Sequence, residues 1–223
     1  HRWVPAPAEE PAAETYPGEA PGQMAEEGDI TIPFGPAAFP LSTPRERWQQ
    51  GQMPYLHQKD VAWRDAPYAG ATAGISACGP TCMDMIYIYL TGGSSYTPAD
   101  LAALADAGNF APTGATEWRY MTDGAAQPGI KGTPVNPYYY EVIPALQAGM
   151  PVVASLMPGD FTLVGHYVVL TGIDEHGMVS IHDPNSVLNS ARTCWPGPDP
   201  APGQHVLGVL ALKAGAPPSQ GPH

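Results

Sequence analysis

The sequence predicts an α+β domain, with helices in its first half and an antiparallel sheet in its second. Segments bounded by helix caps and stops precede residue 149, whereas runs rich in β-branched and aromatic residues follow it. The chain has 223 residues, which is enough for one ordinary domain. Because 43% of these residues are hydrophobic, we expect a single substantial core.

The N-terminal segment has the composition of a tail. Up to Asp29 it holds seven Asp and Glu residues and a single Arg, interleaved with prolines and alanines. A segment of this kind cannot bury enough apolar surface to offset the entropy of ordering it. We therefore expect a disordered tail or linker over residues 1–45, a folded domain over 46–213 and a flexible tail over 214–223.

Turn and cap signals divide the first part of the domain into helices. Pro80 suits the first turn of a helix that Gly92 ends, and Thr97 caps a second helix before Pro98. Gly149 stops the last helix. The expected helices cover residues 78–90, 98–106, 116–127 and 138–148.

Four β-rich runs predict the sheet. The turn Asp-Glu-His-Gly at residues 174–177 separates two of them and indicates a hairpin. The expected strands cover residues 151–156, 166–173, 178–183 and 206–212.

The charge of the chain disfavours two classes of partner. Twenty-one acids and nine bases give a formal net charge of −12. Nucleic acids and anionic membrane surfaces both require clustered Lys and Arg, so we expect neither as a partner. No apolar stretch approaches the ~18 residues of a membrane span. A trimmed start followed by an acidic spacer predicts a secreted or surface-tethered bacterial protein.

Cys78 is the first candidate for chemistry. It lies in Ser-Ala-Cys-Gly-Pro-Thr, directly before the first expected helix. A helix N-terminus is the positive end of the helix dipole and favours a thiolate. The competing interpretation is a buried structural cysteine, which is the commoner state of a free thiol.

A histidine and a carboxylate on neighbouring strands complete a candidate triad. His166 begins one expected strand and could take the thiol proton, while Asp183 closes the next strand and could orient the imidazole. His182 is a rival base and Asn185 a rival orienting group. Each residue taken singly also has an ordinary structural explanation, and Asp-Pro-Asn is common in turns.

Gln58 is the fourth candidate. Its side-chain amide could join the backbone N–H of Cys78 in holding an oxyanion. An isolated Gln usually has no such role.

The order of these residues resembles papain-like cysteine peptidases of the bacteriocin-leader-processing type. The resemblance covers residues 52–195, and its motifs are residues 58–63, 77–81, 148–153, 161–162, 165–172 and 183–186. It implies a papain-like fold, in which the nucleophile begins a helix that packs on an antiparallel sheet. It also implies Cys78 as nucleophile, His166 as base, Asp183 as orienting group and Gln58 in the oxyanion hole. The expected activity is hydrolysis of a peptide or amide bond, with a peptide or protein as substrate and no cofactor.

Several alternatives stay open at this point. The chain could be a catalytically idle binding module, or an acyltransferase or cell-wall amidase that uses the same site. Cys78 and Cys82 together give only a weak metal signal, and a Cys82–Cys194 disulfide is conceivable. The aromatic residues Tyr138–Tyr140, Trp118 and Tyr120 are expected in the core rather than in a groove. The loop around residues 160–161 is expected to border the cleft.

Overall fold

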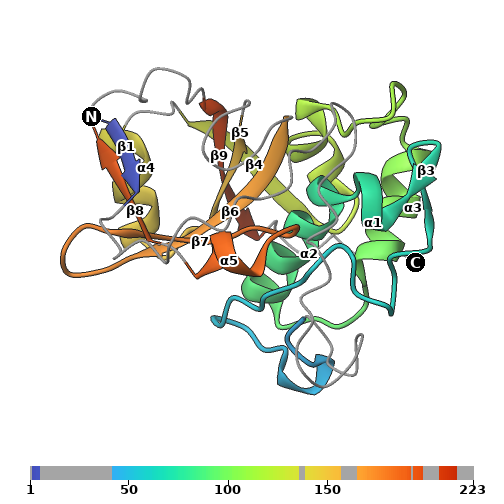
Figure 1. Ribbon diagram of the computed structural model, residues 1–223, viewed down its shortest axis with the longest axis horizontal. Coiled ribbons are helices and arrows are strands. Elements are labelled where there is room, and N and C mark those ends of the chain that lie inside the picture. The colour runs from blue at the N-terminus through green and yellow to red at the C-terminus, as the bar shows by residue number, and fades with distance from the viewer. Residues whose placement is uncertain are drawn as a thin grey trace, which may run out of the picture.

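The computed structural model describes residues 2–5, 42–135, 139–156, 165–191, 193–197 and 206–214. Among these residues, an antiparallel sheet lies beside a group of helices (Figure 1). The strand order is β1-β8-β7-β6-β5-β9-β4. The bounds are β1 (Arg2–Pro5), β4 (Ile130–Val135), β5 (Val152–Leu156), β6 (His166–Ile173), β7 (Val179–His182), β8 (Thr193–Gly197) and β9 (Val206–Ala214). A small hairpin, β2 (Pro67–Tyr68) with β3 (Ala71–Thr72), lies apart from this sheet. The α+β class is confirmed.

Helix α2 (Cys78–Thr91) is the central helix of the domain, and its predicted start is confirmed. A short helix, α1 (Ala73–Ser76), leads into it and was not predicted. Pro80 occupies the first turn of α2, where its missing N–H has no partner to lose. The helix ends at Gly92, which adopts a left-handed conformation with φ 69°.

The central strands β5 and β6 are buried on both faces because helices cover each side. Side chains of β5 and β6 alternate between two cores: Val153 and Val169 pack with α2, whereas Val152 and Val168 pack with α4 (Tyr139–Gln147). Strands buried on both faces read as continuous apolar runs rather than as alternating patterns. This explains why the sequence predicts both strands so clearly.

Helix α3 (Pro98–Ala107) begins at the predicted cap. The Thr97 hydroxyl accepts from the Asp100 N–H at 3.4 Å, and the Thr97 N–H donates to the Asp100 carboxylate at 2.8 Å. This reciprocal capping box fixes the start of the helix. No helix in the described part of the chain is both long enough and apolar enough to cross a membrane.

The helix predicted over residues 116–127 is wrong. Two short 3-10 helices replace it, η2 (Trp118–Met121) and η3 (Gly124–Ala126). Gly124 weakens a continuous helix, and it also lies against the ring of Tyr120. A Cβ at Gly124 would come within 2.3 Å of the Tyr120 Cδ2 atom. Close packing of this aromatic ring therefore accompanies the break.

The sheet is larger than predicted. Strand β4 was missed because it contains Pro134 and Gly132, which are tolerated at the edge position that this strand occupies. Strand β8 was missed in a glycine- and proline-rich stretch. The expected 174–177 hairpin is confirmed: the Asp174 N–H donates to the Met178 carbonyl at 2.9 Å.

The structure also departs from the predicted tail boundaries. Strand β1 lies within the expected tail of residues 1–45 and pairs with β8, Val4 opposite Trp195. Its Trp3 and Val4 have high strand propensity, which outweighed the composition of the surrounding segment. Residues 42–45, which precede the expected start of the domain, are described as well: the Thr43 N–H donates to the Tyr55 carbonyl at 2.7 Å, and β9 runs to Ala214. The expectations for residues 6–41 and 215–223 lie outside the described residues.

The end of α2 gives a prediction about stability. Gly92 and Gly70 both have positive φ, but a Cβ at Gly92 would lie 2.9 Å from the Gln50 nitrogen, whereas a Cβ at Gly70 would meet nothing within 4 Å. We expect Gly70→Ala to lower the free energy of unfolding by about 1 kcal/mol through backbone strain alone. Gly92→Ala should lower it by about 2–3 kcal/mol because the backbone of Gln50 must also move. Urea unfolding at neutral pH measures both; equal losses would contradict the steric argument.

Candidate active site

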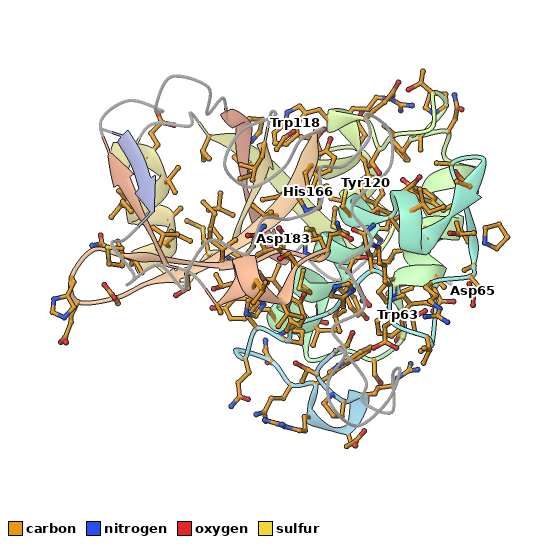
Figure 2. All side chains as sticks on the ribbon, viewed as in Figure 1. Trp63, Asp65, Trp118, Tyr120, His166 and Asp183 are labelled. Atoms are coloured by element: carbon orange, nitrogen blue, oxygen red, sulfur yellow. The ribbon has the colours of Figure 1, made fainter. Side chains whose placement is uncertain are left out.

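His166 and Asp183 meet at one end of the sheet. His166 begins β6 and Asp183 follows β7, and these two strands are paired, Val169 opposite His182. The His166 Nε2 and Asp183 Oδ1 atoms are 2.7 Å apart. Both side chains are almost completely buried, and they lie side by side near the centre of the domain (Figure 2). A buried pair at this distance fixes the orientation of the imidazole.

Cys78 lies near this imidazole. It is half-buried at the first position of α2, which packs against β6, and its sulfur contributes to the electrostatic environment of His166. Burial by itself lowers the pKa of His166, but the Asp183 carboxylate and the Cys78 sulfur together raise it to about 10. The imidazole is therefore held in its protonated form at neutral pH.

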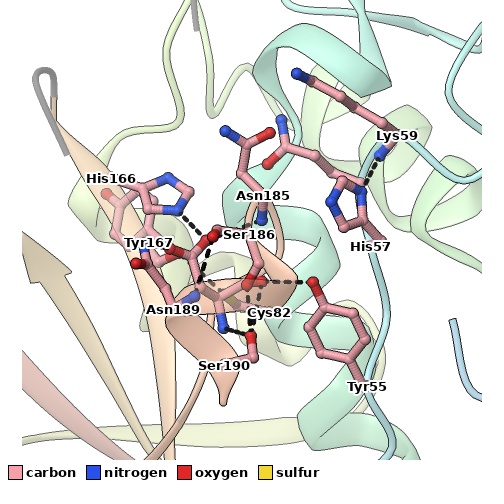
Figure 3. A network of polar contacts seen from close by, with 12 residues as sticks. Tyr55, His57, Lys59, Cys82, His166, Tyr167, Asn185, Ser186, Asn189 and Ser190 are labelled. Atoms are coloured by element: carbon pink, nitrogen blue, oxygen red, sulfur yellow. Dashed lines mark hydrogen bonds and ion pairs between the residues drawn. The ribbon is translucent and has the colours of Figure 1, made fainter. Parts of the chain in front are cut away.

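A network of donors surrounds the Asp183 carboxylate (Figure 3). The Asn189 side chain donates to Oδ2 and the Asn185 N–H donates to Oδ1, each at 2.8 Å. Burial alone raises the pKa of Asp183, but the neighbouring His166 and these hydrogen bonds lower it overall. Asp183 is accordingly kept ionised, as a group that orients a protonated imidazole must be.

The backbone of Asp183 is held as firmly as its side chain. Its N–H donates to the Ser190 hydroxyl at 2.8 Å, and its carbonyl accepts from the Tyr55 hydroxyl at 2.9 Å. Ser190 and Asn189 both belong to α5 (Val187–Ser190), which Ser186 caps. The sequence patterns did not indicate Tyr55, Asn189 or Ser190 as supporting residues. The Ser after Asp-Pro-Asn was the available signal, because it is a helix cap as well as a turn residue.

The two rival residues do not reach the same positions. The His182 Nδ1–H donates to the Pro54 carbonyl at 2.9 Å, and its ring packs edge-on against Tyr55 with centroids 5.5 Å apart. Burial lowers the pKa of His182. Asn185 contacts the Asp183 carboxylate through its backbone N–H. The structure thus brings His166, and not His182, to Cys78.

Gln58 links the two halves of the site. Its side chain is fully buried, and its Nε2 donates to the Gly74 carbonyl of α1 at 2.9 Å. Its backbone N–H donates to the Pro184 carbonyl at 2.7 Å. Gly74 leads into Cys78 and Pro184 follows Asp183, so Gln58 lies between the segments that carry the thiol and the carboxylate.

The segment around Thr116 packs against the start of α2. A Cβ at Gly79 would come within 2.7 Å of Thr116 Cγ2, so only glycine permits this approach beside Cys78. The Tyr68 hydroxyl bonds the Thr116 side chain at 2.7 Å, and the Tyr167 hydroxyl donates to its carbonyl at 3.0 Å. Hydrogen bonds therefore hold this segment in place beside Cys78.

Two of the aromatic residues expected in the core, Trp118 and Tyr120, are described by the structure. Tyr120 is fully buried, and Trp118 stacks on Tyr167 with ring centroids 6.0 Å apart. The core assignment is confirmed for Tyr120, with Trp118 packed against the same core. The side chains of Tyr138–Tyr140 and the loop at residues 160–161 lie outside what the structure describes.

Cys82 is a free, fully buried cysteine. Its thiol donates to the Tyr167 carbonyl at 3.4 Å, and burial raises its pKa. The suggested disulfide with Cys194 is therefore wrong: Cys82 points into the core behind the site. Within the described residues, no three His, Cys, Asp or Glu side chains gather as metal ligands do.

The comparison with known protein families is decisive. The Peptidase_C39 like family matches residues 51–195, more than half of the chain. The chain belongs to this family. The matched range contains Gln58, Cys78, His166 and Asp183, and the family assigns a cysteine-peptidase-like domain with the helix-and-sheet architecture observed here. A search of curated proteins found no match.

Proposed function

We propose that this member of the Peptidase_C39 like family is a cysteine peptidase in which Cys78, His166 and Asp183 act as a catalytic triad. One observation carries the proposal: a single buried imidazole bonds Asp183 at 2.7 Å through Nε2, and the Cys78 sulfur at the start of α2 acts on the same imidazole, together with Asp183 raising its pKa. A nucleophile, a base and a group that orients the base are the recurring parts of such sites.

The reaction follows from the positions of these groups. The Cys78 thiolate attacks the carbonyl carbon, and the resulting oxyanion is held by the Cys78 N–H and the Gln58 amide. The His166 imidazolium gives its proton to the departing amine as the C–N bond breaks, leaving an acyl-thioester. His166 then takes a proton from water, whose oxygen attacks the thioester and releases the carboxylic acid and the Cys78 thiolate, which restores the thiolate and imidazolium of the starting state.

The hydrogen bonds of Gln58 support the role proposed for its amide. Its hydrogen bonds to Gly74 and Pro184 hold the amide beside the segment that leads into Cys78. A preorganised donor of this kind acts on the charge that develops during the reaction, without a reorganisation cost at that moment. An amine that displaced water in the second step would turn the same site into an acyltransferase.

Selective alkylation tests the interaction between Cys78 and His166. We expect iodoacetamide to modify Cys78 in the folded protein, because its sulfur is only half-buried at the start of α2. The rate and its pH dependence should change in His166→Ala, because that variant removes the base beside the sulfur.

Peptide mapping by mass spectrometry provides an internal control. Cys82 lies one helical turn from Cys78 but is fully buried, so it should stay unmodified in the folded protein. An unreactive Cys78, or one whose pH dependence is unchanged in His166→Ala, would contradict the proposal and favour the catalytically idle binding module.

A further inference from the structure

The large exposed apolar side chains lie close in sequence to the candidate site residues. Among the side chains that the structure describes, the large apolar ones left exposed are Val61, Ile75, Val187 and Leu188. We call these four residues the apolar rim. Each lies within five positions of Gln58, Cys78 or Asp183 in the sequence. Exposed apolar side chains beside a site are available to contact a ligand.

Two members of the apolar rim lie in segments that contact each other. Val61 lies in the turn that follows Gln58, and Ile75 follows Gly74 in α1, the helix labelled in Figure 1. The Gly74 N–H donates to the Arg64 carbonyl at 2.9 Å, which packs this turn against α1. Val61 and Ile75 are 57% and 54% exposed, so neither serves the core.

The other two members lie on α5. The Pro184 carbonyl accepts the Gln58 N–H, which brings the segment leading into α5 against the Gln58 loop. Along the helix, Asn189 turns inward to the Asp183 carboxylate, whereas its neighbour Leu188 is 51% exposed. The apolar rim therefore borders Gln58 from both α1 and α5.

The reaction geometry assigns this surface to one part of the substrate. His166 must protonate the departing nitrogen, so the leaving chain begins beside His166, and α5 begins four residues after Asp183, the partner of His166. The Thr116 segment packs against Gly79, the residue that follows Cys78. The residues that follow the scissile bond thus lie nearest to the apolar rim.

We infer that the apolar rim binds apolar side chains at the first or second position after the scissile bond, an inference that rests on the proposed function. Charged side chains have little to bind there: Arg64 and Asp65, in the Val61 turn, lie 3.7 Å apart and balance each other. The net charge of −12 further disfavours acidic substrate residues.

Digestion of a peptide library tests this preference. Wild type, Leu188→Asp and Ile75→Asp are compared, and mass spectrometry identifies the new N-termini. We expect wild-type products to begin with apolar residues at the first or second position. Each rim variant should cleave these peptides about tenfold more slowly and shift its preference toward Lys or Arg at that position. Such a gain of preference cannot come from partial unfolding.

Two controls separate this inference from the function beneath it. Ala103→Asp places the same charge on an exposed position of α3 and should leave the wild-type preference unchanged. Cleavage that requires Cys78 but shows no apolar preference, or a preference unaltered in both rim variants, would overturn the inference alone. Absence of cleavage by wild type, or cleavage that persists in Cys78→Ala, would overturn the proposed function and the inference with it.

Discussion

Cys78→Ala should lose peptide hydrolysis by at least about 10⁴-fold in kcat/KM while the protein stays folded. The alanine side chain offers no nucleophile, and no other described cysteine can replace it, since Cys82 is buried behind the site. Cys78 is only half-buried at the start of α2. Its removal therefore costs the fold little more than one hydrogen bond, about 1 kcal/mol.

Cys82→Ala is the matched control for this experiment. It removes the same atoms from the same helix one turn later, at a fully buried position. We expect it to lower the free energy of unfolding by about 1–2 kcal/mol through the lost packing, with kcat/KM nearly unchanged. Rates on one cleaved peptide and urea unfolding curves measure both effects. Turnover that survives in Cys78→Ala, or that is lost equally in Cys82→Ala, would refute the nucleophile assignment.

The contact between His166 and Asp183 could be predicted because it depends on local sequence. The tight turn at residues 174–177 joins β6 to β7 and sets their antiparallel pairing. A tight hairpin brings the beginning of its first strand and the end of its second to one edge. His166 and Asp183 lie toward those two ends, so the turn predicts that they are close. The unequal strand lengths and the register shift between Leu170 and Gly172 set the final contact, and the turn does not predict them. Cys78 could be placed for a similar reason, because Pro80 and Gly92 mark the two ends of its helix.

The support around the pair could not be predicted because it comes from distant parts of the chain. Tyr55 reaches the Asp183 carbonyl across 128 positions of sequence, and no local pattern records such a contact. The buried position of Cys82 likewise depends on its bond to the Tyr167 carbonyl, which only the packing of α2 on β6 creates. The break between η2 and η3 follows from the close contact of Gly124 with Tyr120. In each case tertiary packing, rather than local sequence propensity, determined the observed structure.

Asp183→Asn should reduce kcat by about 10²–10⁴-fold and change the pH profile. The carboxylate raises the pKa of His166, so its loss lets the imidazole give up its proton at lower pH. Wild type should keep a protonated general acid up to a pH of about 10. The alkaline limb of kcat/KM in the variant should therefore move to lower pH. A limb that stays in place would show that Asp183 does not set the protonation of His166.

The same carboxylate makes the stability of the fold depend on pH. The folded-state pKa of Asp183 is lowered overall, so its contribution is present above its unfolded pKa of about 3.9 and is lost as pH falls through the folded value. His166 has a raised pKa, and its contribution is lost as pH rises through about 10. Asp183→Ala leaves the Asn189 and Asn185 donors without their acceptor. It should lower the free energy of unfolding by about 3–5 kcal/mol at pH 7. The difference in this free energy between the variant and wild type should become smaller at acidic pH.

Urea unfolding at pH 7 and in acid checks the size and the direction of this effect. Asp65→Asn is the matched control, because it removes a carboxylate that is 87% exposed and outside the network. It should change stability by less than about 0.5 kcal/mol at either pH. A constant deficit for Asp183→Ala across this range would mean that packing around the side chain, rather than its charge, stabilises the site. Asp183 would then be a structural residue, and the orientation of His166 would depend on the backbone of β6 instead.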